Sequence, residues 1–464
     1  DLNMAFLIGG ANSAADTAYE VANSCRFNSG DSPSMTRDNG TPTNLKKFSI
    51  SLWHKRAEIL DNKYLIVGFD DESNRTLFQF ASDKLLFQNQ TGGSSNTIIK
   101  SNALYRDRAA WYHFCVIVDT TQATDTNRVK MYVNGSQVTS LASSTYPSQN
   151  TDMELTDATN SILLNQKGDG SDYNSGYYAE VVVLDGTAAS ITDFGEFDSD
   201  SLTIWKPKDV SELTFGTNGF YLDFEDSANL GNDANGGTDF TETNLAAADQ
   251  ATDTPTNNFC VMNVLDNYYS GAAFSEGNCK VVSTTGTYPY NTATFGVASG
   301  KWYWEVKVAT SSSDGQLIGI ANYPVTATNH DLGKFAYEYG YSSNNGKINT
   351  SGTGTTYGNS YTTSIISVAL NLDDNEIQFY KDGTVQNSGT AHAIVAPAST
   401  DTGFYFPAVG DNGATGTYEF NFGGCPAFAI SSGNADADGY GNFEYAVPSG
   451  FFALNTKNLG AYGG

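Results

Sequence analysis

The chain has 464 residues, of which 51 are acidic and 24 basic, and its formal net charge is −27. A nucleic-acid-binding protein needs a basic stripe to displace counterions, so this balance excludes that class and disfavours an anionic membrane surface as partner. Charged residues make up only 16% of the chain and aromatic residues 13%, with 46 glycines. That mixture is typical of turn-rich β structure and excludes disorder.

The chain opens with a weakly patterned stretch, residues 1–20, whose longest apolar run covers residues 4–11. This run is too short to cross a bilayer and has no basic flank, so we expect no membrane insertion. We interpret residues 1–20 as an N-terminal arm that packs on a neighbouring subunit, with the remnant of a processed signal as the alternative.

Residues 21–224 alternate between short apolar runs and turn residues, a pattern typical of half-buried strands. About nine runs at this spacing predict a sandwich or barrel. A short helix is expected after Ser190, because Ser190 and Asp193 have the spacing of a capping box. The runs are 48–53, 64–69, 76–80, 84–88, 96–100, 111–118, 128–133, 177–184 and 219–224.

Residues 225–258 are rich in Gly, Asn, Asp and Thr and contain no basic residue, so we interpret them as an acidic linker. Strand-like runs then resume, which predicts a second sandwich with a C-terminal tail over residues 259–464. These runs are 279–283, 293–297, 301–308, 317–321, 335–341, 365–372, 376–381, 403–410, 417–422 and 449–455.

The five cysteines are odd in number and widely spaced, without a Cys-x-x-Cys pair. This pattern disfavours a disulfide framework and a zinc site, and indicates folding in a reducing cytoplasm. They are Cys25, Cys115, Cys260, Cys279 and Cys425.

One hairpin pattern occurs twice, at residues 111–135 and 364–383. Each copy holds an alternating strand, an acidic polar turn, a second alternating strand and then Asn-Gly or Asp-Gly. Those dipeptides suit the positive φ angles of a tight hairpin turn. Two copies predict two sandwiches of related design.

The first domain resembles the laminin G-like, concanavalin A-like lectin family. Residues 111–119 and 128–135 carry the W-x-H strand, the Asp and the φ-Y-φ-N-G strand of that family, where φ is apolar. Residues 176–186 and 191–194 resemble its final strand with a small appended helix. These ordered matches cover most of residues 21–224.

The second domain resembles a SPRY domain over about residues 259–455. Residues 300–306, G-K-W-Y-W-E-V, correspond to the G-x-x-Y-W-E-V strand of that family. Further matches follow in order at 317–321, 339–347, 366–373, 379–383, 406–409 and 420–423.

A laminin G-like domain joined to a SPRY domain is similar to large surface proteins of tailed bacteriophages, marine ones especially, as are residues 6–13 and 25–28. The resemblance implies an all-β fold of two tandem antiparallel concanavalin A-like jelly-roll sandwiches with an N-terminal arm. It also implies a virion appendage protein that is assembled in the host cytoplasm and displayed on the virion surface.

We therefore interpret the chain as a non-enzymatic tail or head fibre or spike that contributes to host attachment. The expected partners are other virion proteins, further copies of the chain, and a host-surface glycan or protein. Two alternatives stay open: a purely structural capsid decoration protein, and a secreted glycan-acting enzyme or adhesin.

Loop aromatic residues are the main ligand-binding candidates, because loops form the binding face in this fold family. Tyr323, Tyr357 and Tyr361 lie in the predicted SPRY connections, and His330 and Asp331 lie in another loop. Aromatic residues on the alternating strands are interpreted as core.

No cofactor is predicted, with calcium as an alternative. Asp436 and Asp438 begin a D-x-D-G loop that lacks the closing Glu of a calcium loop. The acidic turns at 70–72 and at Asp169 and Asp172 are further candidates for oxygen ligands, against solvated turns as the simpler interpretation.

No catalytic residue is predicted. Concanavalin-type glucanases carry E-x-D-x-x-E on one strand, whereas Glu196, Asp198 and Asp200 lack the second Glu and are interpreted as an exposed acidic turn. His113 lies on the strand of Trp111 and is interpreted as a packed or hydrogen-bonded residue.

Overall fold

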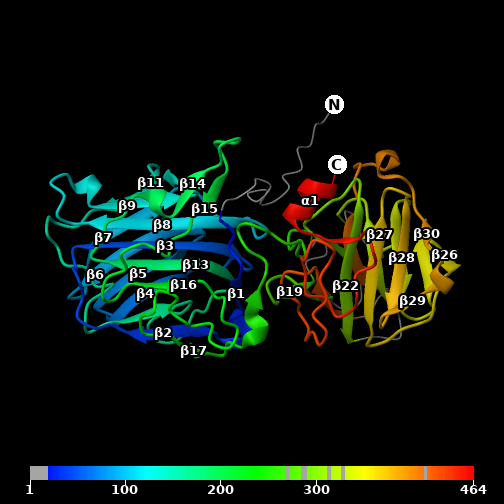
Figure 1. Ribbon diagram of the computed structural model, residues 1–464, viewed down its shortest axis with the longest axis horizontal. Helices are drawn as coiled ribbons and strands as arrows, with labels where there is room; N and C mark the ends of the chain where they lie inside the picture. Colours follow the sequence, from blue (N-terminus) through cyan, green and yellow to red (C-terminus); the bar gives the residue numbers. More distant parts are fainter. Residues whose placement is uncertain are drawn as a thin grey trace. The chain divides into compact units, whose positions relative to one another are not determined.

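The computed structural model describes residues 19–266, 271–283, 290–310, 315–324, 330–411 and 415–463. Most of the predicted arm, residues 1–18, therefore lies outside the described residues. The chain divides into two compact units, one ending at Thr256 and one beginning at Asn257. Strands dominate both units, and α1 (Thr456–Tyr462) is the one α-helix in the described parts of the chain (Figure 1).

The first unit consists of two eight-stranded antiparallel sheets. Sheet A has the order β10-β9-β8-β3-β13-β1-β18 with β16 beside β13, and sheet B has the order β11-β7-β6-β5-β4-β12-β2-β17. Sheet A comprises β1 (Ser24–Phe27), β3 (Lys47–Arg56), β8 (Trp111–Asp119), β9 (Val129–Val133), β10 (Ser136–Gln137), β13 (Gly176–Asp185), β16 (Phe220–Leu222) and β18 (Gln250–Ala251). Sheet B comprises β2 (Ser34–Asp38), β4 (Lys63–Asp71), β5 (Asn74–Ala81), β6 (Lys84–Thr91), β7 (Ser94–Ser101), β11 (Leu141–Thr145), β12 (Ser161–Leu164) and β17 (Thr241–Thr243).

The inner faces of these sheets form the core of the first unit. Alternate residues of β3, namely Phe48, Ile50 and Leu52, are fully buried there and belong to one cluster with Phe80 and Phe87 of sheet B. Fully burying an apolar side chain of this size contributes about 1.5–3 kcal/mol. This packing of two sheets confirms the predicted sandwich.

The outer face of sheet A is also covered. Residues that follow β13, including β14 (Gly195–Phe197) and β15 (Trp205–Pro207), bury a second cluster that contains Cys115, Val182 and Phe215. The predicted capping box is confirmed, because Ser190 accepts from the N–H of Thr192 while Asp193 accepts from the N–H of Ser190.

The acidic segment 225–258, predicted as a linker, is different in the structure. Its β17 pairs with β2 and its β18 pairs with β1, so it supplies an outer strand to each sheet of the first unit. Near its end, Asp253 lies 2.7 Å from the ammonium of Lys55 and accepts at 2.9 Å from the indole N–H of Trp111. Polar anchors and strands of two or three residues leave no apolar alternation, which is why the sequence pattern indicated a linker.

The second unit also contains two sheets. Sheet C has the order β19-β20-β32-β22-β27-β28-β29, with β30 beside β28 and β33 parallel to β22; sheet D has the order β21-β31-β23-β24-β25-β26. Sheet C comprises β19 (Ala273–Ser275), β20 (Lys280–Val282), β22 (Lys301–Thr310), β27 (Ile365–Asn371), β28 (Glu376–Lys381), β29 (Thr384–Val385), β30 (His392–Ala393), β32 (Thr417–Asn421) and β33 (Phe452–Ala453). Sheet D comprises β21 (Tyr290–Thr292), β23 (Gln316–Ala321), β24 (Glu338–Ser342), β25 (Lys347–Thr350), β26 (Thr353–Thr356) and β31 (Phe406–Asp411).

The core of the second unit lies between sheets C and D. Trp302, Trp304 and Val306 of β22 are fully buried in it, which confirms the prediction that this aromatic strand is core. The run 293–297 was expected to be a strand but forms only isolated bridges, at Ala293 and Val297.

Both predicted hairpin turns are confirmed. Asn134 and Gly135 have φ angles of 45° and 73°, and Asp382 and Gly383 have φ angles of 47° and 76°. The first turn joins β9 to β10 and the second joins β28 to β29. A side chain at Gly135 would also collide with the ring of Trp205, so glycine is required there for space as well as for φ.

Candidate functional site

The first unit has a pocket of about 380 Å³ on the outer face of the hairpin β8–β9. Val129 and Met131 of β9 point inward and belong to the core. Because side chains alternate along a strand, Lys130 and Tyr132 point to the outer face of the sheet. The pocket is completed by the segment that follows β13. Its lining is Ile117, Asp119, Gln122, Asn127, Lys130, Tyr132, Ala188, Ala189, Ser190 and Ile191.

One part of the pocket is apolar. Ile117, Tyr132, Ala189 and Ile191 are half-buried and pack against the outer cluster of sheet A. Burial raises the pKa of the Tyr132 phenol, which stays neutral and can donate a hydrogen bond. An aromatic ring beside aliphatic groups is a surface on which the C–H face of a sugar or an aromatic ligand packs.

The polar rim of the pocket contains one carboxylate, Asp119. Its Oδ1 accepts from the N–H and hydroxyl of Thr121, and its Oδ2 accepts from the amide of Gln122 at 2.7 Å and lies 3.5 Å from the Lys47 ammonium. Partial burial raises the pKa of Asp119, but these hydrogen bonds outweigh it and hold the pKa below its ordinary value. Asp119 is thus an ionised acceptor that fixes the rim.

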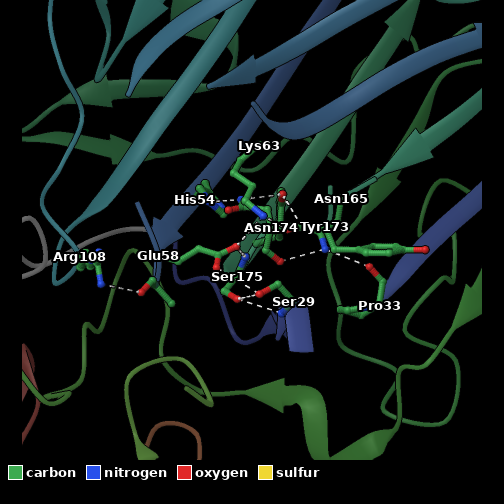
Figure 2. A network of polar contacts seen from close by, with 12 residues as sticks. Ser29, Pro33, His54, Glu58, Lys63, Arg108, Asn165, Tyr173, Asn174 and Ser175 are labelled. Carbon is green, nitrogen blue, oxygen red and sulfur yellow. Dashed lines mark hydrogen bonds and ion pairs between the residues drawn. The ribbon is translucent and has the colours of Figure 1, made fainter. Parts of the chain in front are cut away.

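Figure 2 shows a second polar network in the first unit, which joins residues 29–33, after β1, to the loops after β3 and β12. The Glu58 carboxylate accepts from the N–H of Ser175 at 2.9 Å and from the hydroxyl of Ser29 at 3.1 Å, and it lies 3.2 Å from the ammonium of Lys63. The Asn165 amide donates to the carbonyl of Pro33 at 3.0 Å. The polar groups of this network bond to one another, so we interpret the network as a structural clamp, a set of contacts that holds the loops together.

We expect Glu58→Ala to destabilise the first unit by about 2 kcal/mol, because three donors lose their acceptor and the Lys63 side chain is only 10% exposed. Hydrogen exchange of the full chain, followed by mass spectrometry, should show faster exchange around residues 29 and 175. Asp61→Ala, an exposed carboxylate of the same loop, is the matched control and should change stability by less than about 0.5 kcal/mol. Equal exchange in the two variants would contradict the clamp.

Two family models match the chain. Residues 28–190 match the concanavalin A-like lectin/glucanases superfamily in its laminin G-like form, and residues 301–424 match the SPRY domain. The chain carries a laminin G-like domain followed by a SPRY domain. Both are folds typical of binding domains. No curated protein sequence matches the chain at a significant level.

Several solved structures are similar to parts of the chain. The SPRY domain of human HERC1 is 17% identical over 32% of this chain and 91% of its own, with a TM-score of 0.26. A heptameric SAP-like pentraxin from Limulus polyphemus is 17% identical over 38% and 81%, with a TM-score of 0.28. A candidate carbohydrate-binding protein from Bacteroides ovatus is 16% identical over 48% and 57%, with a TM-score of 0.33.

Two of the tyrosines predicted as ligand-binding loop residues of the SPRY domain are core residues. Tyr357 is 5% and Tyr361 is 3% exposed. The Tyr361 hydroxyl donates to the carbonyl of Tyr341 at 2.7 Å, and the Tyr357 hydroxyl accepts from the amide of Gln378 at 2.7 Å. Both hydroxyl groups form hydrogen bonds inside the protein, so the prediction that Tyr357 and Tyr361 contact a ligand is wrong.

The other three predicted residues lie near one another in the chain, and His330 is buried. Its Nε2 lies 2.5 Å from an oxygen of Glu338, and both side chains are at most 1% exposed. Tyr323 and Asp331 are half-buried, and the Tyr323 ring centroid lies 6.4 Å from that of His330. Burial raises the pKa of Asp331. Tyr323 and Asp331 remain predicted ligand contacts, whereas His330 has a structural partner.

The Asp436 carboxylate, a calcium candidate, has four internal donors. Its Oδ1 accepts from the N–H groups of Asp438 and Tyr440. Its Oδ2 accepts from the N–H of Ala453 and the amide of Asn458. The Asp438 carboxylate has a different partner and accepts from the Tyr462 hydroxyl. The two carboxylates therefore fasten the C-terminal segment through hydrogen bonds.

The other acidic turns are arranged around a lysine. Lys167 lies 2.9 Å from a carboxylate oxygen of Asp169 and 3.9 Å from one of Glu72, while Asp172 is exposed. An ammonium already occupies the position where a cation would neutralise these turns. Within the described ranges, no group of three or more His, Cys, Asp or Glu side chains is arranged to hold a metal ion.

The side chains considered for hydrolysis are also structural. Asp198 accepts from the N–H groups of Asp200 and Ser201 and pairs with Lys206 at 2.9 Å. His113 is confirmed as packed and hydrogen-bonded.

The tautomer of His113 follows from its two partners. The indole of Trp205 donates to Nδ1 at 3.1 Å, so Nε2 carries the proton and donates to the hydroxyl of Ser51 at 2.8 Å. Burial lowers the pKa of His113 to about 3, and neither it nor Ser51 is open to a substrate.

The pocket residues carry no motif that predicts a site. The outward positions of Lys130 and Tyr132 were visible in the alternation V-K-M-Y-V, but alternation alone does not distinguish a pocket from a flat surface. All five cysteines are buried and none of them forms a disulfide within the described residues. No helix of the described residues is long and apolar enough to span a membrane.

Proposed function

We propose that the chain is a non-enzymatic surface protein of a tailed bacteriophage particle, a tail or head fibre or spike that contributes to host attachment. It binds cell-surface glycan or protein through the laminin G-like and SPRY domains, and its other partners are virion proteins and further copies of itself. Fibre proteins are commonly symmetric oligomers, so we propose a homo-oligomer, which light scattering of the full chain tests.

The observation that carries the proposal is the pairing of two binding folds in one chain, the first of which has an amphipathic open pocket. An apolar floor with a polar rim is the general form of a ligand site. The acidic surface, with a net charge of −27, favours solubility and disfavours nonspecific adsorption to anionic cell envelopes.

The test is adsorption of the labelled full chain to bacterial cells and to an array of bacterial envelope polysaccharides. We expect saturable binding to a subset of strains, insensitive to a divalent-cation chelator, and loss of infection when antibodies to the chain coat the particle. An absence of binding, with infection intact under the antibodies, would refute attachment and leave capsid decoration. Release of reducing sugar from a bound polysaccharide would refute the non-enzymatic assignment.

A further inference from the structure

Lys130 lines the pocket on the hairpin β8–β9, and no carboxylate of the described residues forms an ion pair with it. No hydrogen bond or ion pair joins its ammonium to another residue in the described parts of the chain. Opposite charges are abundant, since the chain holds 51 acidic residues against 24 basic ones. A half-buried lysine that faces a pocket and has no carboxylate partner in so acidic a protein points to an anionic ligand.

The one carboxylate that lines the pocket does not neutralise Lys130. Both oxygens of Asp119 are committed, Oδ1 to Thr121 and Oδ2 to Gln122 and the ammonium of Lys47. Because Lys47, outside the lining, is the counter-charge of Asp119, the ammonium of Lys130 is the charged group of the lining that is left for a ligand. A ligand anion here faces a low-dielectric floor, where a charge-assisted hydrogen bond to an ammonium is stronger than in water.

The remainder of the lining fits a sugar ring. The Tyr132 ring and the side chains of Ile117 and Ile191 offer an apolar surface to the C–H face of a pyranose. The exposed amide of Asn127 and the exposed Ser190 add donors and acceptors at the rim for ring hydroxyls. Its volume of about 380 Å³ lies in the range of small-ligand sites, about 300–1,000 Å³.

We infer that this pocket binds a carboxylate-bearing pyranose, a hexuronate residue of an acidic polysaccharide, with Lys130 on the carboxylate and Tyr132 under the ring. The inference rests on the proposed glycan-binding function and names the class of sugar. It also assigns the site to the outer face of the hairpin in the laminin G-like domain.

The probes are a hexuronate tetrasaccharide and the neutral tetrasaccharide made from it by reducing each carboxyl group to an alcohol. Both are titrated calorimetrically onto the full chain at low and high salt. At low salt we expect the hexuronate to bind about tenfold more tightly than the neutral tetrasaccharide. This ratio corresponds to a difference of about 1.4 kcal/mol in binding free energy. The preference should fall in high salt, because salt screens the ammonium.

Lys130→Gln should remove this preference, whereas Tyr132→Ala should weaken the binding of both sugars. The matched control is Lys84→Gln, a half-buried lysine of sheet B, which should leave both affinities unchanged. Equal binding of the two sugars, or a preference that survives Lys130→Gln, would overturn the inference. Cell adsorption by the Lys130→Gln protein at the unmodified level would overturn this site and leave the proposed attachment function intact. Failure of the unmodified chain to adsorb to any cell would refute both.

Discussion

Replacing Asp253 with alanine is expected to destabilise the first unit by about 3–5 kcal/mol, the range for breaking one side of a buried ion pair. The Lys55 side chain is fully buried and that of Asp253 is 2% exposed, with 2.7 Å between the ammonium and the carboxylate. The same carboxylate accepts from the Trp111 indole at 2.9 Å. The substitution therefore removes the counter-charge of a buried cation and the acceptor of a buried N–H group together.

Calorimetric unfolding of the full chain, with hydrogen exchange to locate the change, measures this effect. Exchange should accelerate in β1, β3 and β18, while the SPRY domain keeps its protection. Asp152→Ala is the matched control, because Asp152 pairs with Lys46 and these side chains are 59% and 35% exposed. That exposed pair should contribute less than about 1 kcal/mol.

A second variant separates charge from packing. Replacing Lys55 by Met and Asp253 by Leu together removes both buried charges, and such exchanges are often neutral or stabilising. We expect the double variant to recover the part of the stability that Asp253→Ala loses through the unpaired Lys55 charge, but not the part that comes from the lost acceptor of the Trp111 indole. If Asp253→Ala unfolds like Asp152→Ala, the segment 251–256 is not an anchor of the first unit.

The fold was accessible from the sequence because its signals are local. Asn134-Gly135 and Asp382-Gly383 favour positive φ whatever surrounds them, and alternation along β8 and β22 is visible within a few residues. The acidic segment was misassigned because its anchor is long-range: Asp253 acquires its role only when Lys55, 198 residues earlier, lies beside it. A composition count cannot supply that contact.

The candidate site was less accessible for the same reason. Tyr357 and Tyr361 occupy connections in the sequence, yet the chain after β26 folds over the sandwich and places both rings in the core. Conversely, Lys130 and Tyr132 look like ordinary outward strand residues until Ala189 and its neighbours pack beside them. Loop position is therefore a weak guide to exposure in domains whose connections cover their own sheets.

Glu180 combines strain and burial in one residue of β13. The pairing of β13 with β3 is interrupted by a bulge between Ala179 and Val182. Glu180 lies in this bulge with a φ of 50°, a backbone angle that residues other than glycine rarely adopt. Its carboxyl group is buried and accepts from the hydroxyls of Tyr19 and Tyr221, each at 2.9 Å. Strand β13 thus holds a carboxyl group that is only 5% exposed.

Burial raises the pKa of Glu180, the hydrogen bonds from Tyr19 and Tyr221 lower it, and the nearby charges of Asp223 and Glu225 raise it again, so that the pKa lies at about 8. Below about pH 4.5, the ordinary pKa of a glutamic acid, the group is protonated in the folded and the unfolded chain and costs nothing. Between there and about pH 8 the unfolded chain loses the proton while the folded chain keeps it, so stability falls as the pH rises. Above about pH 8 the loss is complete.

Glu180→Gln is expected to remove this pH dependence and to stabilise the first unit by about 5 kcal/mol at pH 8.5, with almost no effect at pH 4.5, because the pKa is about 8 instead of 4.5 and each pKa unit corresponds to about 1.4 kcal/mol. Hydrogen exchange of β13 and β16 in the full chain, compared between variant and unmodified protein across that range, measures it. The difference isolates Glu180 because every other titrating group is shared by the two proteins. Glu196→Gln, an exposed carboxylate of the same unit, should follow the unmodified protein throughout. A Glu180→Gln protein that also followed it would show that Glu180 ionises in the folded chain as it does in water, and that water or a cation reaches the bulge of β13.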